Sequence, residues 1–235
     1  MTNVERISTG VIGLNQLLKG GLPAGSMALV IGAPGSGKST LGKQFLFDSL
    51  TKQRPAVLID TFEPLELAKE TMAAFGWGGP LLDEMIFLDC YSWRTGAAKQ
   101  KYSANPKNLT DSSLVLSDLL KDEIDANSRA RFVIDSFSDF VLHSGAVQAQ
   151  KFLESIKAKL AERRVTSLVM LEAGIHEEKV NAVIEYVTDG TIRMQYEERG
   201  RSLMVSRMLG TPATMKWIPF TLAQGVEMAV ANYFS

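Results

Sequence analysis

The sequence predicts an α/β fold: a mostly parallel central sheet flanked by helices, with an antiparallel hairpin extension toward the C-terminus. Three observations support this prediction. Short aliphatic runs without polar alternation recur along the chain, as is typical of parallel strands covered on both faces. The segments between them place apolar residues three and four apart, which is the helical spacing. Near the C-terminus the pattern changes to alternation, which indicates antiparallel strands.

Five aliphatic runs predict the parallel strands. They cover residues 26–32, 55–60, 84–90, 131–136 and 166–171. Helical spacing predicts helices around Leu41, Leu67, Leu116 and Phe152. Strands joined through helices in this way form βαβ units, so we expect a doubly wound sheet in one domain that spans residues 1–235.

Two regions depart from this alternation of strands and helices. Residues 92–110 are polar and contain Gly96 and Pro106, so we expect a long loop, a kind of segment that often carries function. Residues 190–210 alternate on either side of "EERGR", which predicts a hairpin with Gly200 in its turn. The stretches "MKWIPFTL" and "GVEMAV" predict two further short strands.

Composition limits the partners. The net charge is −1, which gives no overall electrostatic attraction for nucleic acid. Residues 99–102, together with Lys107, form a small basic and aromatic patch, which leaves a DNA contact open as an alternative to a solvated loop. Cys90 is the single cysteine, which excludes an internal disulfide and a cysteine-built metal site. No stretch approaches the ~18 apolar residues of a spanning helix, so we expect no membrane partner and a cytoplasmic location.

The stretch "IGAPGSGKST", residues 31–40, indicates a phosphate-binding loop. It fits G-x-x-x-x-G-K-[ST] at every fixed position, through Gly32, Ala33, Pro34, Gly35, Ser36, Gly37, Lys38 and Ser39. Glycines let backbone N–H groups wrap round a triphosphate, and the helix that follows points its positive end at the anion. Lys38 would reach the β- and γ-phosphates, Ser39 would ligate Mg²⁺, and Thr40 completes the predicted binding residues. The motif therefore predicts ATP and Mg²⁺ as cofactors.

Asp135 ends the apolar run "RFVIDS". A Mg²⁺ ion bound at the phosphates needs a second protein anchor, which a neighbouring strand usually supplies. We therefore predict that Asp135 and Ser39 are the two metal-binding residues. The alternative is an aspartate that caps the loop after its own strand.

The stretch from Ile7 to Leu46 resembles the opening of KaiC-like and RadA-like ATPases of the RecA superfamily. The runs "ISTG", "GLNQLL" and "GGLPAGS" stand where that family has similar residues, and "AAFGW", "VIDSFS", "VTDGTIRM" and "SRMLGT" continue the likeness to about Val230. The resemblance implies a RecA-like P-loop NTPase core, often assembled as a hexameric ring with ATP between neighbouring subunits. It is closest to stand-alone single-domain members, which include RadA recombinase paralogues and ATP-binding switches.

One departure from the family pattern concerns the general base. After the second strand the family usually carries two adjacent glutamates, one of which activates the attacking water. Here Glu63 stands alone, directly before Pro64. Glu63 is therefore our candidate base, with Asp60 in reserve and Lys38 as the other catalytic candidate. Capping of the following helix by Glu63 is the alternative.

A second departure concerns the neighbouring subunit. The family often presents a Lys-x-Arg-Gly-Thr run toward the phosphates of the next subunit. Here Arg207 takes the lysine position and is predicted to contact nucleotide, but Leu209 replaces the arginine, and Gln224 replaces an acidic residue that is common further on. Loss of such a finger costs ~10³-fold or more in rate. Glu172 closes the fifth strand near the position of the family's γ-phosphate sensor, which makes it a candidate for that role. The alternative is a strand-end carboxylate that bonds to a loop.

These features leave several functions open. The leading prediction is an ATP-binding protein that hydrolyses ATP to ADP and phosphate slowly, or acts as an ATP-dependent switch. It would work through self-assembly, for example into a hexamer, or through a protein partner that completes the ATP site. The alternative is a recombinase paralogue that binds DNA or modulates strand exchange. A small-molecule kinase fits least well, because the sequence has no arginine-rich lid segment.

Overall fold

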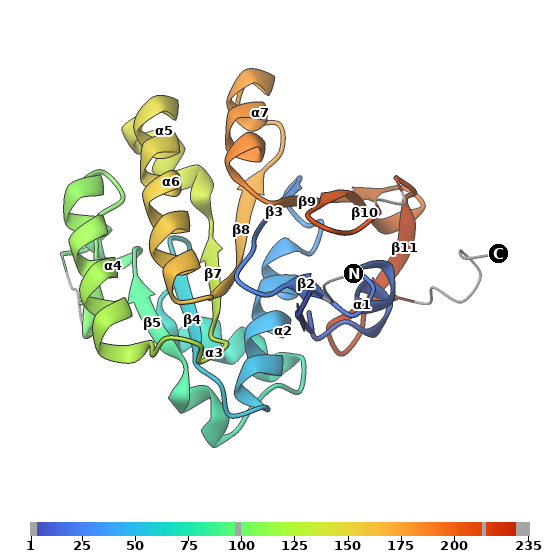
Figure 1. Cartoon of the computed structure of the whole chain (residues 1–235), viewed down its shortest axis with the longest axis horizontal. Helices are drawn as coiled ribbons and strands as arrows, with labels where there is room; N and C mark the ends of the chain where they lie inside the picture. The colour runs from blue at the N-terminus through green and yellow to red at the C-terminus, as the bar shows by residue number, and fades with distance from the viewer. Residues whose placement is uncertain (1–3, 97–99, 213–214, 229–235) are drawn as a thin grey trace.

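A central sheet positions the rest of the molecule (Figure 1). The computed structural model describes residues 4–96, 100–212 and 215–228. Within these ranges the strands of the sheet are β3 (Met27–Gly32), β4 (Ala56–Asp60), β5 (Ile86–Asp89), β6 (Tyr102–Ser103), β7 (Arg131–Asp135), β8 (Thr166–Glu172), β9 (Gly190–Glu197), β10 (Gly200–Met208), β11 (Ile218–Leu222) and β12 (Val226–Glu227). Their order in this 10-stranded sheet is β12-β11-β10-β9-β3-β8-β7-β4-β5-β6. The strands from β9 to β6 are parallel and the other three antiparallel, as predicted.

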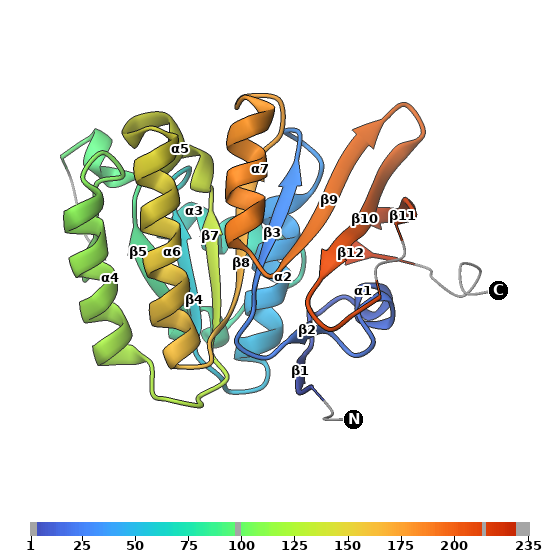
Figure 2. The ribbon, with the colours of Figure 1, turned by 45° about the horizontal axis from the view of Figure 1, so that its top comes forward.

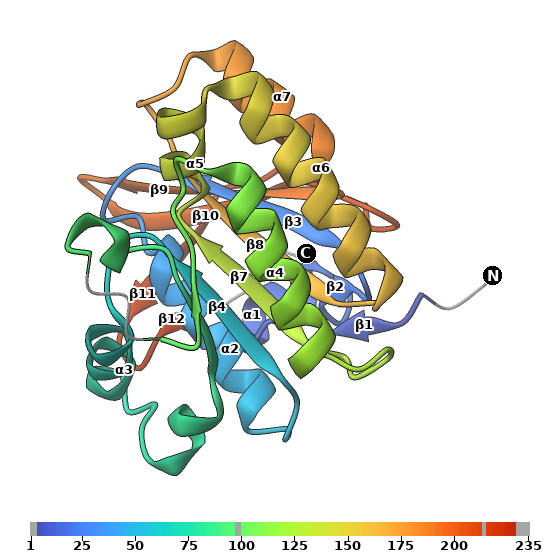
Figure 3. The same ribbon diagram turned by 90° about the vertical axis from the view of Figure 1, so that its left-hand side faces the viewer.

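Helices cover both faces of the sheet. They are α1 (Ile12–Leu17), α2 (Lys38–Leu50), α3 (Leu65–Ala74), α4 (Leu109–Glu123), α5 (Phe137–Ser144), α6 (Ala146–Glu162) and α7 (Glu178–Val187), with the 3-10 helices η1 (Pro80–Glu84) and η2 (Ser92–Arg94). α4, α6 and α7 lie side by side over one face (Figure 2), and the side view places α2 and α3 over the other (Figure 3). No helix in the described ranges is long and apolar enough to cross a membrane.

The core explains why the strand sequences lack polar alternation. Successive side chains of a strand point to opposite faces of the sheet. On β3, Val30 belongs to the cluster that contains Phe45 of α2, whereas Leu29 belongs to the cluster that contains Ile156 of α6. Because helices bury both faces, both sets of side chains are apolar.

The parallel register gathers the strand ends at one edge of the sheet. Gly32 pairs with Glu172, and Asp60 pairs with Asp135 on one side and Asp89 on the other. The phosphate-loop motif and the predicted metal and base residues therefore leave the sheet at the same edge. Ligands of open parallel sheets bind outside this carboxyl edge.

The segment predicted as a long loop contains more regular structure than expected. η2 lies near its start, and β6 pairs with β5 through Leu88 and Tyr102. α4 begins at Leu109, inside the predicted loop. β6 is only 2 residues long, so no aliphatic run marks it; the edge of the sheet supplies the pairing. The separate two-stranded sheet of β1 (Arg6–Ile7) and β2 (Leu22–Pro23) lacks such a run for the same reason.

Candidate functional site

The loop between β3 and α2 depends on three glycines for two different reasons. Gly35 and Gly37 have φ angles of 76° and 96°, a left-handed conformation that side chains rarely adopt. Gly32 is required by packing, because a Cβ there would lie 2.3 Å from the carbonyl oxygen of Met194 on β9. The backbone of residues 33–37 therefore turns sharply between a close-packed strand and the start of a helix.

The N-terminus of α2 is left without a side-chain cap. Gly37 is its N-cap residue, and the first turn contains no acidic residue. In contrast, Asn108 and Ser136 cap α4 and α5 with side-chain hydrogen bonds. Within the described part of the chain, the buried Ser36 hydroxyl also lacks a hydrogen-bond partner. Uncapped N–H groups at the positive end of a helix suit an anion, as the sequence motif predicts.

The side chain of Lys38 folds back over the loop. Its ammonium donates to the carbonyl oxygens of Gly32 at 2.8 Å and Ala33 at 3.1 Å, and to Oε2 of Glu172 at 2.9 Å. The backbone N–H of Glu172 donates to Oγ of Ser138, also at 2.9 Å. Glu172 therefore does lie at the phosphate loop, where its carboxylate holds the lysine that the motif assigns to phosphate.

The two predicted metal residues lie together. Asp135 is buried at the end of β7, and burial raises the pKa of its carboxyl group. A hydrogen bond from the Ser39 hydroxyl and the positive charges of Lys43 and Lys38 oppose this increase. A hydroxyl and a carboxylate are oxygen ligands of the kind that Mg²⁺ takes, so the donor set fits the ion that the sequence predicts.

Asp60, the reserve candidate for the base, also has a raised pKa. Burial and the neighbouring charge of Asp135 raise the pKa of Asp60 to about 8. Its Oδ1 accepts N–H bonds from Phe62 at 2.7 Å and Glu63 at 2.9 Å, which oppose the increase. At neutral pH this carboxyl group is protonated, so it does not accept a proton from water.

Glu63 is held by a lysine that no sequence motif singles out. Its Oε1 pairs with Nζ of Lys43, which also donates to Oγ1 of Thr71 at 2.6 Å. The side chains of Lys43 and Glu63 are 7% and 15% exposed. Glu63 does not cap α3: the N-cap residue is Pro64, which makes no side-chain cap bond. The helix-capping alternative is therefore wrong, and an ion pair takes its place.

The comparisons with known proteins agree with this geometry. A profile described as "ATPase: KaiC" matches residues 7–231. The chain belongs to the KaiC family of ATPases. A UPF0273 protein of Methanopyrus kandleri is 28% identical over 240 residues, with 98% of this chain and 94% of the relative covered. A UPF0273 protein of Pyrobaculum aerophilum is 30% identical, with 94% of this chain and 81% of the relative covered.

The fold agrees with that of a solved KaiC-like protein. The crystal structure of a KaiC-like protein from Pyrococcus horikoshii superposes on this chain with a TM-score of 0.78 at 22% identity. The superposition covers 97% of this chain and 100% of the other. Together with the family profile, this confirms the predicted RecA-like P-loop architecture.

In this KaiC-family chain, Arg207 lies away from its own phosphate loop. Its guanidinium donates to the carbonyl oxygens of Glu185 at 2.6 Å and Thr188 at 2.8 Å, at the end of α7. Leu209 projects nearby with 60% of its surface exposed. Contact of Arg207 with nucleotide in a neighbouring subunit stays a prediction.

Arg201 is a contact of the phosphate loop that sequence reasoning missed. Its Nε donates to the carbonyl oxygen of Gly35 at 2.9 Å, and its guanidinium lies 4.3 Å from the ring centre of Tyr196. It belongs to the "ERGR" turn, which the alternating pattern explains as an ordinary hairpin. Only the pairing of β9 with β3 brings that turn to the loop.

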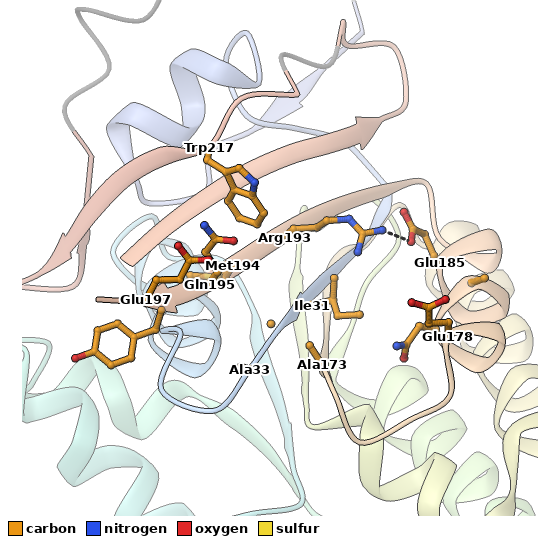
Figure 4. Close-up of a pocket in the computed structure, with 14 residues that line it drawn as sticks. Ile31, Ala33, Ala173, Glu178, Glu185, Arg193, Met194, Gln195, Glu197 and Trp217 are labelled. Atoms are coloured by element: carbon orange, nitrogen blue, oxygen red, sulfur yellow. Dashed lines mark hydrogen bonds and ion pairs between the residues drawn. The ribbon is translucent and has the colours of Figure 1, made fainter. Parts of the chain in front are cut away.

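A cavity of about 630 Å³ borders the phosphate loop on the β9 side of β3. Figure 4 shows it between the end of β3, α7 and β9, with Trp217 over it and Arg193 pointing to Glu185. Its walls do not include Lys38, Ser39 or Asp135. The cavity therefore adjoins the predicted phosphate site and shares Gly32 and Ala33 with it.

The basic and aromatic patch combines exposed lysines with a buried tyrosine. Lys101 forms an ion pair with Glu123 at 2.7 Å, and Tyr102 is 6% exposed. Lys107 lies 4.6 Å from the ring centre of Trp93. Lys99 lies outside the described residues. A buried tyrosine gives no stacking platform for a base, which favours the solvated-loop interpretation.

Proposed function

We propose that this chain is an ATP-dependent switch that binds ATP with Mg²⁺ and hydrolyses it slowly. One observation carries the proposal: an uncapped helix N-terminus follows a complete phosphate-loop motif, beside a lysine, a hydroxyl and a carboxylate. Membership of the KaiC family supports nucleotide binding. The amides of residues 32–40 would hold the phosphates, as in other proteins with this motif.

Each polar residue has a role in this proposal. Lys38 would leave Glu172 and bind the β- and γ-phosphates, because a phosphate carries more negative charge than one carboxylate. Ser39 and Asp135 would hold Mg²⁺, which supplies neutralisation of the charge that develops on the transferred phosphoryl group. Glu63 would take the proton of the attacking water.

Slow turnover follows from the groups that act on the transition state. Glu63 is engaged by Lys43, and Leu209 stands where the family often has an arginine. Binding to the ground state does not by itself accelerate the chemical step. A neighbouring subunit or a protein partner would therefore have to supply what this chain lacks.

Two measurements made side by side test the proposal. We expect light scattering to show assembly that depends on Mg·ATP, or a monomer that retains its nucleotide. We expect phosphate release to be slow in both cases. Rapid phosphate release by the isolated chain would contradict the proposed weakness of hydrolysis. Failure of the chain to bind Mg·ATP would contradict the switch itself.

A further inference from the structure

A second lysine of α2 lies behind the phosphate loop. Lys43 is almost completely buried, and its ammonium is fixed between two oxygen acceptors, a carboxylate oxygen of Glu63 and Oγ1 of Thr71. The Thr71 hydroxyl donates its own hydrogen to the carbonyl oxygen of Ala68 at 2.9 Å, so its lone pairs face the ammonium. The phosphate-loop motif requires no lysine at this position.

The backbone of Glu63 is held as well. Oδ1 of Asp60 accepts the N–H groups of both Phe62 and Glu63, so the carboxylate of Glu63 moves mainly by rotation of its side chain. A Glu63 carboxylate without its lysine would lie unpaired near a further carboxyl group, that of Asp60. Leaving one member of a buried ion pair without its partner is strongly unfavourable.

We propose that Lys43 is a positioning residue that restrains Glu63 and keeps ATP hydrolysis slow. This inference rests on the proposed function. A carboxylate oxygen engaged by an ammonium is not free to accept a hydrogen bond from water, and a general base must reach the proton that it removes. In the reaction, the water oxygen bonds to the γ-phosphorus, the bond to the ADP oxygen breaks, and Glu63 takes the water proton. Lys43 must release Glu63 first.

Steady-state kinetics of four variants test the restraint. At saturating Mg·ATP, Lys43→Met should raise kcat about 10-fold, equivalent to about 1.4 kcal/mol of the barrier. Saturation is needed because the charge of Lys43 also acts on Asp135. Lys43→Arg keeps the ion pair and should retain the low rate. The double variant Lys43→Met/Glu63→Gln should lose the gain. Lys52→Met is the control, because Lys52 follows the end of α2 and pairs with Asp48 on that helix.

The kinetic outcomes separate this inference from the proposed function. Unchanged or lower kcat in Lys43→Met, with the analogue still bound, would overturn the restraint and leave nucleotide binding intact. A gain that persists in the double variant would also overturn it, because the gain would not pass through Glu63. Loss of analogue binding by the unmodified chain would instead remove the proposed function.

A spectroscopic test needs neither hydrolysis nor a folded Lys43→Met variant. In the unmodified protein, the buried ion pair should protect the Lys43 ammonium from exchange with water, which gives an observable NMR signal for its hydrogens. Lys43→Arg assigns that signal. Glu63→Gln keeps the shape of the side chain and removes its charge, so the signal should disappear. A signal that stays unchanged in Glu63→Gln would overturn the restraint.

Discussion

Lys38 and Lys43 lie on the same helix, and their partner glutamates lie at the ends of two different strands: Glu172 closes β8, and Glu63 follows β4. Their side chains are similarly buried, with 4% and 7% of their surface exposed. Lys38 also donates to two carbonyl oxygens of its own loop, and its partner Glu172 closes β8 beside the loop. Lys43 instead faces α3 and Glu63.

The two pairs therefore belong to two different steps. In the first pair, Glu172 holds Lys38, the lysine that the motif assigns to phosphate, so this pair competes with nucleotide binding. In the second pair, Lys43 holds Glu63, the candidate base, so this pair acts on turnover. Burial and pairing alone do not separate these roles; the position of each lysine relative to the phosphate loop does.

Removal of Lys38 should have the largest effect. In Lys38→Ala the affinity for Mg·ATP should fall about 100-fold or more, because charge-assisted bonds to phosphate are lost. Calorimetric titration measures the change, and Lys52→Ala serves as the control for loss of a lysine just after the same helix. Wild-type affinity in Lys38→Ala would contradict the assignment of the first pair to binding.

Loss of the Asp135 carboxylate, one of the two predicted Mg²⁺ ligands, should have the next largest effect on nucleotide affinity. Asp135→Asn keeps the size of the side chain and removes its charge, so the contribution of Mg²⁺ to nucleotide affinity should fall about 10-fold or more. Titrations with and without Mg²⁺ separate this from a general loss of binding. Equal losses under both conditions would show that Asp135 acts on the fold and not on the metal.

Weakening the Lys38–Glu172 pair should increase the affinity for ATP. Glu172→Gln removes the charge that competes with phosphate for Lys38, so ATP affinity should rise about 5-fold, or about 1 kcal/mol. Glu185→Gln is the matched control, because Glu185 on α7 forms an ion pair with Arg193 on β9 at 2.7 Å. Unchanged or lower affinity in Glu172→Gln would mean that Glu172 supports the lysine and does not compete for it.

The pH dependence of stability gives a separate test, which is made without nucleotide. The pKa of Asp60 is about 8 in the fold, above its ordinary value of 3.8, so the folded state binds more protons. Its contribution to stability is therefore present below about pH 4 and is lost as the pH rises through 8. The free energy of unfolding in urea should fall between pH 5 and 9 relative to Asp60→Asn, which keeps the acceptor for Phe62 and Glu63. Parallel curves would argue against a protonated Asp60.

Local signals made the fold and the loop predictable. The aliphatic runs predicted β3, β4, β5, β7 and β8, because strands buried on both faces need continuous apolar sequence. The phosphate loop was predictable because its chemistry depends on residues within one short stretch. The strand-terminal position of Asp135 identified it as a metal candidate.

The ion pairs were not predictable in the same way. Glu172 and Lys38 are 134 residues apart, and they meet because β8 pairs with β3. Lys43 and Glu63 are only 20 residues apart, yet their contact depends on how α2 packs near the start of α3. Strand order and helix packing determine these contacts, and neither leaves a pattern in the residues themselves. Sequence spacing could identify Glu63 as a candidate general base, but it could not show that Lys43 forms an ion pair with it.

A crystal structure with Mg²⁺ and a non-hydrolysable ATP analogue tests the central claim most directly. The account predicts that the phosphates lie against the amides of residues 33–39 and that Mg²⁺ lies between Ser39 and Asp135. It also predicts that Nζ of Lys38 has left Glu172 for the phosphates. A nucleotide bound elsewhere, for example in the cavity beside α7, with the Lys38–Glu172 pair intact, would contradict it.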